Sequence, residues 1–154
     1  MAAQRAAIRL IERQDRTTAD LRARLVARGF SIETVEWVID RLVSKDLLND
    51  RRFAERFAEL AASERGMGSR RVRMELVRRG VEPEMATETG LDLAITDHDR
   101  AVASARKRAK RLEGLPNEVA YRRLLGFLAR KGFPPDVCLD ATREALRGLT
   151  AEQL

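Results

Sequence analysis

The sequence predicts an all-α protein, an elongated and curved array of three tandem three-helix repeats with about nine helices. Three observations support this prediction. Of the 154 residues, 44% are hydrophobic, only 5% are aromatic and 35% are charged, which is typical of helices with an apolar face beneath a charged surface. Apolar residues recur at helical spacing and nowhere alternate as in a strand. One short motif also occurs three times.

The repeated motif is a glycine that follows a basic residue and precedes an apolar residue. It reads RLVARGF at 24–30, ELVRRGV at 75–81 and FLARKGF at 127–133. Its glycines, Gly29, Gly80 and Gly132, lie 51 and 52 positions apart. Glycine accepts the left-handed conformation that ends many helices, and the apolar residue after it can pack on the last turn. We therefore interpret the motif as a helix stop used three times.

The first repeat is expected over residues 1–48. Its first helix ends near Asp15. Thr17 then provides an N-cap for a second helix, which Gly29 ends, and Ser31 provides the N-cap of a third helix. The apolar face of the third helix consists of Val35, Val38, Ile39 and Leu42. Trp37 is expected in the core or between repeats, and the alternative is that it anchors an interface with a partner.

The second repeat is expected over residues 49–96. Asn49 or Asp50 caps its first helix, and the segment GMG at 66–68 breaks that helix. Ser69 caps the middle helix, and Pro83 stands in the first turn of the third helix, where proline is tolerated. The apolar face of the first helix is expected to hold Phe53, Phe57, Leu60 and Ala61.

The third repeat is expected over residues 97–154. Asp97 caps a helix that runs to about Leu112. The segment GLPN at 114–117 forms a turn, residues 119–131 form the middle helix, and Pro134 and Pro135 open the last helix. With the glycines aligned, Leu21, Val72 and Leu124 share one register position, and Leu25, Leu76 and Leu128 share another.

Charge is distributed unevenly along the chain. Thirty Lys and Arg residues against 24 acidic residues give a formal net charge of +6, which favours polyanions or acidic protein surfaces as partners. Residues 82–99 hold six acids and no Lys or Arg. Fourteen basic residues on the expected helices are candidates for partner binding: Arg70, Arg71, Arg73, Arg78, Arg79, Arg106, Lys107, Arg108, Lys110, Arg111, Arg122, Arg123, Arg130 and Lys131. The alternative is solvated helix faces that pair with acidic neighbours.

Two kinds of site find little support in the sequence. A recognition helix for the DNA major groove would follow the glycine turn, but SIETVEWVID at 31–40 carries acids that phosphates repel. Phosphate loops of the GxxxxGK[ST] type, HExxH and GxSxG are missing. His98 lies between two aspartates, yet adjacent helical residues point in different directions, so this segment is interpreted as a helix start. We expect no enzyme activity, no cofactor and no metal.

Cellular location is constrained by three features. The single cysteine, Cys138, cannot form an internal disulfide, and it occupies a register position that small apolar residues hold in the other repeats. A redox role of Cys138 stays open. No apolar run approaches the ~18 residues of a membrane span, and Arg5, Arg9 and Glu12 interrupt any signal-peptide core. A soluble, cytoplasmic and monomeric protein is expected.

Two segments of the chain resemble the RecX family of bacterial recombination regulators. These are LLNDRRFAERFA at 47–58 and GMGSRRVRMELVRRGV at 66–81. Segments 16–25 and 122–133 resemble the flanking repeats of that family. Val72 and Val81 stand where isoleucine is commoner, and Arg79 replaces a lysine. The likeness covers nearly the whole chain and is looser at 82–118.

The resemblance implies a fold of three tandem three-helix repeats and a role in DNA recombination and repair, including the SOS response. It also implies binding in the groove of the RecA–DNA filament, mainly with inhibition of ATPase, strand exchange and co-protease activity, and contact with DNA. A different reading, from charge alone, is a DNA-binding protein that is indifferent to sequence and binds single or double strands.

Overall fold

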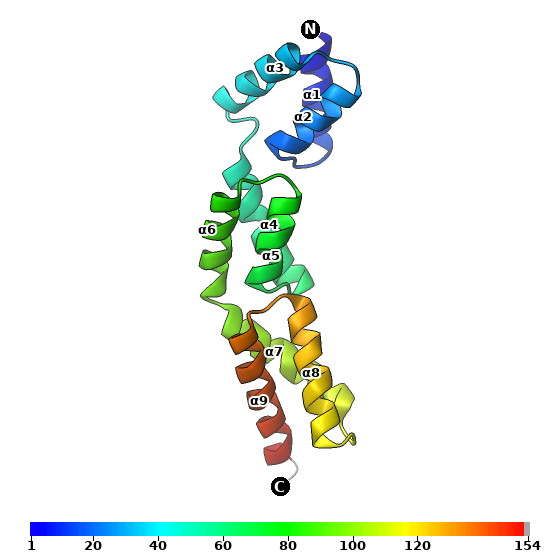
Figure 1. Ribbon diagram of the computed structural model, residues 1–154, viewed down its shortest axis with the longest axis vertical. Coiled ribbons are helices and arrows are strands. Elements are labelled where there is room, and N and C mark those ends of the chain that lie inside the picture. Colours follow the sequence, from blue (N-terminus) through cyan, green and yellow to red (C-terminus); the bar gives the residue numbers. More distant parts are fainter. Residues whose placement is uncertain (153–154) are drawn as a thin grey trace.

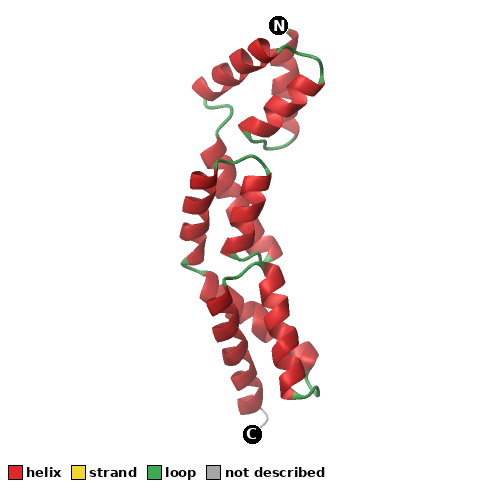
Figure 2. Ribbon diagram, viewed as in Figure 1, coloured by secondary structure: helices red, strands yellow, loops and turns green. Residues whose placement is uncertain are grey.

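The computed structural model describes residues 1–152, with side chains described to residue 149. All regular structure in this range is helical (Figure 2). The α-helices are α1 (Ala2–Arg13), α2 (Thr18–Ala27), α3 (Ile32–Ser44), α4 (Asp50–Arg65), α5 (Ser69–Arg78), α6 (Pro83–Ala94), α7 (Asp97–Ala109), α8 (Asn117–Lys131) and α9 (Pro135–Glu152). A 3-10 turn, Lys110–Leu112, follows α7. None of the described helices is long and apolar enough to cross a membrane.

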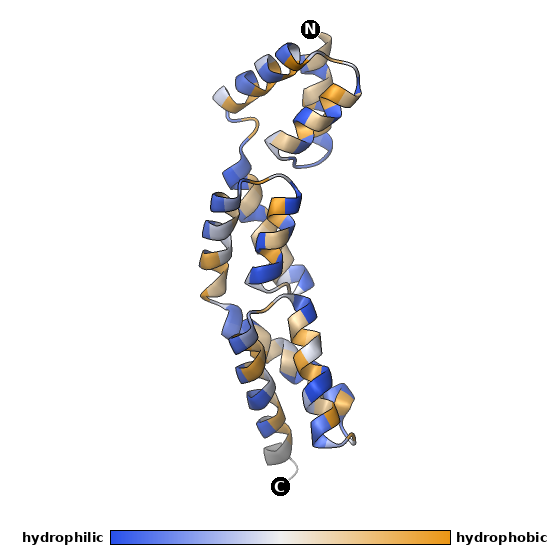
Figure 3. Cartoon of the chain, viewed as in Figure 1, coloured by the Kyte–Doolittle hydropathy of each residue, from blue (hydrophilic) through white to orange (hydrophobic). Residues whose placement is uncertain are grey.

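The helices form an elongated stack of three groups, α1–α3, α4–α6 and α7–α9, referred to below as the first, second and third repeats (Figure 1). The first repeat is tilted against the other two, which bends the stack. The expected all-α repeat array is thereby confirmed. Figure 3 shows hydrophilic and hydrophobic residues interleaved along each helix, as in amphipathic helices.

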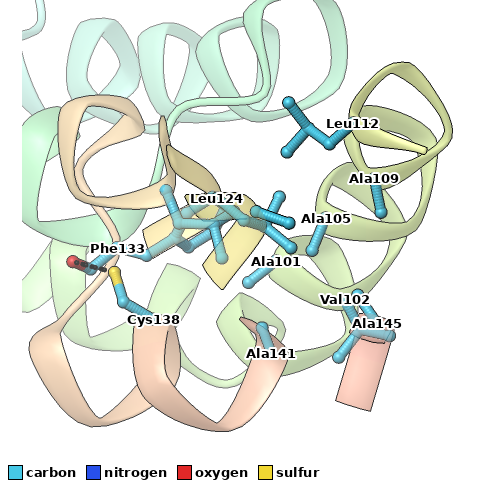
Figure 4. Packing of buried hydrophobic residues seen from close by; sticks show 12 residues of the cluster. Ala101, Val102, Ala105, Ala109, Leu112, Leu124, Phe133, Cys138, Ala141 and Ala145 are labelled. Atoms are coloured by element: carbon cyan, nitrogen blue, oxygen red, sulfur yellow. Dashed lines mark hydrogen bonds between the residues drawn. The ribbon is translucent and has the colours of Figure 1, made fainter. Parts of the chain in front are cut away.

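Each repeat has its own hydrophobic core. The residues that share register positions before the glycines are all fully buried: Leu21, Leu25, Val72, Leu76, Leu124 and Leu128. In the third repeat, Ala101 and Ala105 of α7 lie close to Leu124 of α8, and Ala141 and Ala145 of α9 belong to the same cluster (Figure 4). Because alanine side chains are small, these helices can pack closely. The helical spacing therefore predicted the buried side of every middle helix correctly.

Glycine ends all three middle helices as predicted. Gly29, Gly80 and Gly132 have φ values of +90°, +93° and +90°. In each case the amide of the next residue donates to a carbonyl five positions back, as in the bond from Phe133 N to Leu128 O at 3.3 Å. This is the Schellman motif, which satisfies carbonyls that the helix end would otherwise leave unpaired.

The middle helices of successive repeats meet end to end (Figure 1). The end of α8 lies against the start of α5, and the end of α5 lies against the start of α2. The carbonyl of Gly132 accepts from the amides of Arg70 and Arg71 at 3.1 and 3.3 Å. The amide of Gly68 donates to Lys131 O at 2.8 Å. Free amides at the start of α5 are thus paired with free carbonyls at the end of α8.

The junction between the first and second repeats follows the same plan. The Thr17 hydroxyl donates to Arg79 O at 2.6 Å, and Gly80 lies against Ala19 of α2. A Cβ at Gly80 would lie 2.5 Å from the Ala19 Cβ. The glycine therefore has two functions, because it ends a helix and also allows close contact with the preceding repeat.

An aspartate at the start of each following repeat strengthens the junction. Asp50 accepts from the amide and the hydroxyl of Thr18 at 2.8 and 3.0 Å. Asp97 accepts from the Ser69 amide at 3.1 Å and from the Ser69 hydroxyl, and it is fully buried. Arg100 donates to Asp97 at 2.7 Å. Each aspartate thus caps the middle helix of the repeat before its own.

Two predicted caps therefore have a different role. Ser69 and Asp97 were expected at N-cap positions, but Gly68 and Thr96 occupy those positions without a side-chain cap. Ser69 and Asp97 are instead the first residues of α5 and α7. Their side chains bond each other across the junction rather than capping their own helices.

Two apolar side chains that the sequence placed on buried faces are exposed in the structure. Trp37 is 43% exposed, with the Arg41 guanidinium 5.4 Å from its ring. Leu60 is 48% exposed because α4 packs through the neighbouring face that carries Ala54 and Ala61. Both residues follow the helical spacing, but the neighbouring helices cover a narrower stripe than that spacing suggests.

Candidate partner-binding surfaces

Nearly all of the basic residues predicted to bind a partner are exposed, with only Arg108 and Lys131 partly buried. Only Arg78 and Arg106 of this set form an ion pair with a carboxylate among the described residues, Arg78 with Glu75 at 3.6 Å and Arg106 with Glu144 at 3.1 Å. Intramolecular pairing with acidic helices therefore does not account for most of this charge. The structure collects eight of the predicted residues into two separate surfaces.

The first surface, called the basic cleft, lies where the end of α4 meets α7 and α8. Its volume is about 280 Å³. It is lined by Glu64, Arg65, Gly66, Ser104, Lys107, Arg108, Arg111, Phe127 and Lys131. The chain brings five cations to this one site, against one acid, from helices that are distant in sequence.

Phe127 organises the basic cleft. The Arg108 guanidinium lies 5.2 Å from the centre of its ring, and the Lys131 ammonium lies 5.7 Å from it. Cation–π attraction holds both charges over the ring. Lys131 also donates to Arg65 O at 3.0 Å. Fixed cations beside an aromatic ring suit a phosphate backbone.

The second surface, called the inter-repeat groove, runs between α5 of the second repeat and α8 and α9 of the third. Its volume is about 640 Å³. Its rim carries Arg70, Arg71, Glu75, Arg78 and Arg130, and its remaining lining is Met74, Leu125, Ala129, Gly132, Phe133, Pro135, Cys138 and Leu139. This groove therefore combines four arginines with a largely apolar floor.

The other predicted residues lie outside both surfaces. Arg73 packs against Gly90 of α6, Arg79 lies over the Phe57 ring at 4.7 Å, and Arg106 pairs with Glu144. Lys110, Arg122 and Arg123 line neither surface. Sequence reasoning missed Arg65, because this residue ends α4 and so lies outside the helices that the sequence identified as basic.

Comparison with known proteins shows what kind of chain carries these surfaces. Three family models match in chain order: "RecX, first three-helix domain" over residues 3–42, the second three-helix domain over 49–89 and the third over 96–142. Together they cover most of the chain. The chain belongs to the RecX family.

Relatives and solved structures agree with this. A Regulatory protein RecX from Amycolatopsis mediterranei is 35% identical over 138 residues, which are 89% of this chain and 79% of that protein. One from Mycobacterium sp. (strain KMS) is 35% identical over 147 residues, covering 92% and 80%. The crystal structure of RecX from Lactobacillus salivarius matches 94% of both chains with a TM-score of 0.86 at 21% identity, which supports the fold.

Within this RecX-family chain, both surfaces belong to the second and third repeats, and the groove exists only because those repeats meet. The Nε2 atom of His98 lies 3.4 Å from the Oε2 atom of Glu144. In the described part of the chain, no three His, Cys, Asp or Glu side chains are grouped to hold a metal ion.

Cys138 is 2% exposed, and its thiol donates to Phe133 O at 3.4 Å (Figure 4). Burial raises the pKa of the Cys138 thiol, and the Asp136 and Asp97 carboxylates raise it further. A raised pKa keeps the thiol protonated and weakly nucleophilic. The expectation that Cys138 is a buried small residue is confirmed.

Proposed function

We propose that this protein regulates the RecA recombinase, mainly as an inhibitor. It binds in the groove of the RecA–DNA filament and suppresses ATP hydrolysis, strand exchange and co-protease activity. It acts as a cytoplasmic monomer. Membership of the RecX family, whose relatives in other bacteria bear the name Regulatory protein RecX, supports the regulatory role.

The observation that carries this proposal is the pair of cationic surfaces on one elongated stack. A filament groove is long and offers repeated acidic and phosphate groups. Two surfaces on one firmly joined body can bind such a partner together, so the second contact is made at a high effective concentration. Both contacts include an electrostatic contribution, so binding weakens as salt increases.

A second candidate function is binding to DNA without RecA and without sequence preference. The basic cleft favours it, because Arg108 and Lys131 lie over the Phe127 ring and Lys107 lines the same cleft. The two functions are separated by one salt series in which affinity is measured for naked single-stranded DNA and for the same DNA coated with RecA. A filament regulator binds the coated DNA more tightly at every salt concentration. Equal affinity, or preference for naked DNA, favours the second function.

Charge reversal in the basic cleft should weaken inhibition. For the triple variant Lys107→Glu, Arg108→Glu and Arg111→Glu, we expect the concentration that halves RecA's DNA-dependent ATPase to rise about tenfold or more, since ~1.4 kcal/mol of lost binding is tenfold. Arg5→Glu, Arg9→Glu and Arg13→Glu make the same change of charge at exposed positions of α1, in the first repeat and outside both surfaces. This matched control should shift the concentration by less than about threefold, because exposed, distant charges are screened. Equal shifts would exclude a specific role of the cleft, provided that circular dichroism shows both variants folded.

A further inference from the structure

The geometry points to different ligands for the two surfaces: the inter-repeat groove takes an acidic, amphipathic segment of a protein, with carboxylates beside one or two apolar side chains. This inference rests on the proposed function, because RecA is the protein expected to present that segment. In this assignment, DNA binds in the basic cleft.

The floor of the groove is the first argument. Met74 is 60% exposed, and the partly buried Leu125 and Leu139 line the groove with it. A phosphate backbone has no apolar surface to bury against such a floor. An apolar side chain inserted there would remove both its own surface and that of Met74 from water, which favours binding. Flexible methionine at a binding surface also adapts to different side chains.

The rim is the second argument. Arg70, Arg71 and Arg130 have no carboxylate partner among the described residues, and Arg78 has only a 3.6 Å pair with Glu75. The Arg78 side chain is 78% exposed, so this pair is weak. Guanidinium groups bind carboxylates through two parallel hydrogen bonds. Unpaired arginines around an apolar floor therefore complement a segment that is acidic and apolar at once.

The walls of the groove are held in place by the repeat junction. The amides of Arg70 and Arg71 are bonded to the Gly132 carbonyl, and the Arg71 guanidinium donates to Arg130 O at 3.3 Å. Both sides of the rim are thus tied together before any ligand arrives. Preorganisation lowers the entropy cost of binding. A volume of about 640 Å³ accommodates a few side chains, not a whole helix.

The test uses labelled probes and three matched triple variants. The probes are a short synthetic peptide of glutamates with two leucines one helical turn apart, the same peptide with serines for leucines, and an oligothymidine. The groove variant is Arg70→Glu, Arg78→Glu and Arg130→Glu, and it is compared with the cleft variant and the control variant described above. Fluorescence anisotropy at physiological salt gives each affinity, and circular dichroism checks folding.

We expect the groove variant to bind the leucine peptide at least about tenfold more weakly than the wild type, while its affinity for oligothymidine changes less than about threefold. The cleft variant should show the reverse. Met74→Ser, at an exposed position, should weaken binding of the leucine peptide and not of the serine peptide. Equal affinity of the wild type for both peptides, or a loss of oligothymidine binding in the groove variant, would overturn the inference.

Binding to RecA-coated DNA separates this inference from the proposed function. If the wild type binds the leucine peptide through the groove but not RecA-coated DNA, the proposed function fails while the ligand class of the groove stands. If the wild type binds RecA-coated DNA and the groove variant binds it equally well, the proposed function stands and the groove assignment is wrong.

Discussion

Gly132→Ala should lower the free energy of unfolding by about 3 kcal/mol or more, whereas Gly29→Ala should lower it by only about 1 kcal/mol. The two glycines have the same φ of +90° and the same place in their repeats. A Cβ at Gly132 would lie 2.8 Å from the Arg71 backbone nitrogen and 2.9 Å from its Cα. At Gly29 it would meet nothing within 4 Å. The difference in the free energy of unfolding between the two variants therefore reports the close contact at the repeat junction, because the helix end is the same in both.

Urea denaturation followed by far-ultraviolet circular dichroism gives both values. Because repeats contact only their neighbours, loss of one junction can also separate the unfolding of the third repeat from that of the others. Gly132→Ala should accordingly broaden or split the transition. Equal losses for the two variants, with a single sharp transition in each, would mean that the close contact at Gly132 contributes nothing.

Asp97→Ala should lower the free energy of unfolding by about 3 kcal/mol, whereas Asp50→Ala should lower it by about 1 kcal/mol. Both aspartates cap the middle helix of the preceding repeat, but only Asp97 is fully buried and bonded to an arginine. Its removal leaves the Arg100 side chain, 21% exposed, without its carboxylate. Asp50 is partly exposed, so water replaces some of its bonds.

Thermal or urea unfolding of the two aspartate variants provides the measurement, with Asp99→Ala as a control because Asp99 is exposed on the same helix. Asp99→Ala should change the free energy of unfolding by less than about 0.5 kcal/mol. If Asp97→Ala were as mild as Asp99→Ala, the buried network would not hold the second and third repeats together. The walls of the inter-repeat groove would then be held mainly by the bonds from α5 to the Gly132 and Arg130 carbonyls.

Local features of the fold were predictable from the sequence. The caps at Thr17 and Ser31 and the stops at the three glycines depend on residues within one turn, and each is found as predicted. The buried faces of the middle helices follow from helical spacing in the same way. The family resemblance at 47–81 likewise depends on contiguous residues, and the family models confirm it.

Features that depend on distant residues were not predictable. The partner of Asp97 is Ser69, 28 positions away, and Thr17 bonds Arg79, 62 positions away. Sequence patterns carry no signal for such pairs. For the same reason, the sequence identified a set of exposed cations but could not divide them between a cleft and a groove. Trp37 was misplaced because spacing shows which residues share a face, not how much of that face is covered.

The most direct test of the central claim is a titration of the purified protein into RecA filaments on single-stranded DNA while ATP hydrolysis is followed. We predict that the rate of hydrolysis falls as the protein is added, and that the groove and cleft variants require higher concentrations than the control variant. A rate that stays constant even when the protein exceeds RecA would contradict the proposed function.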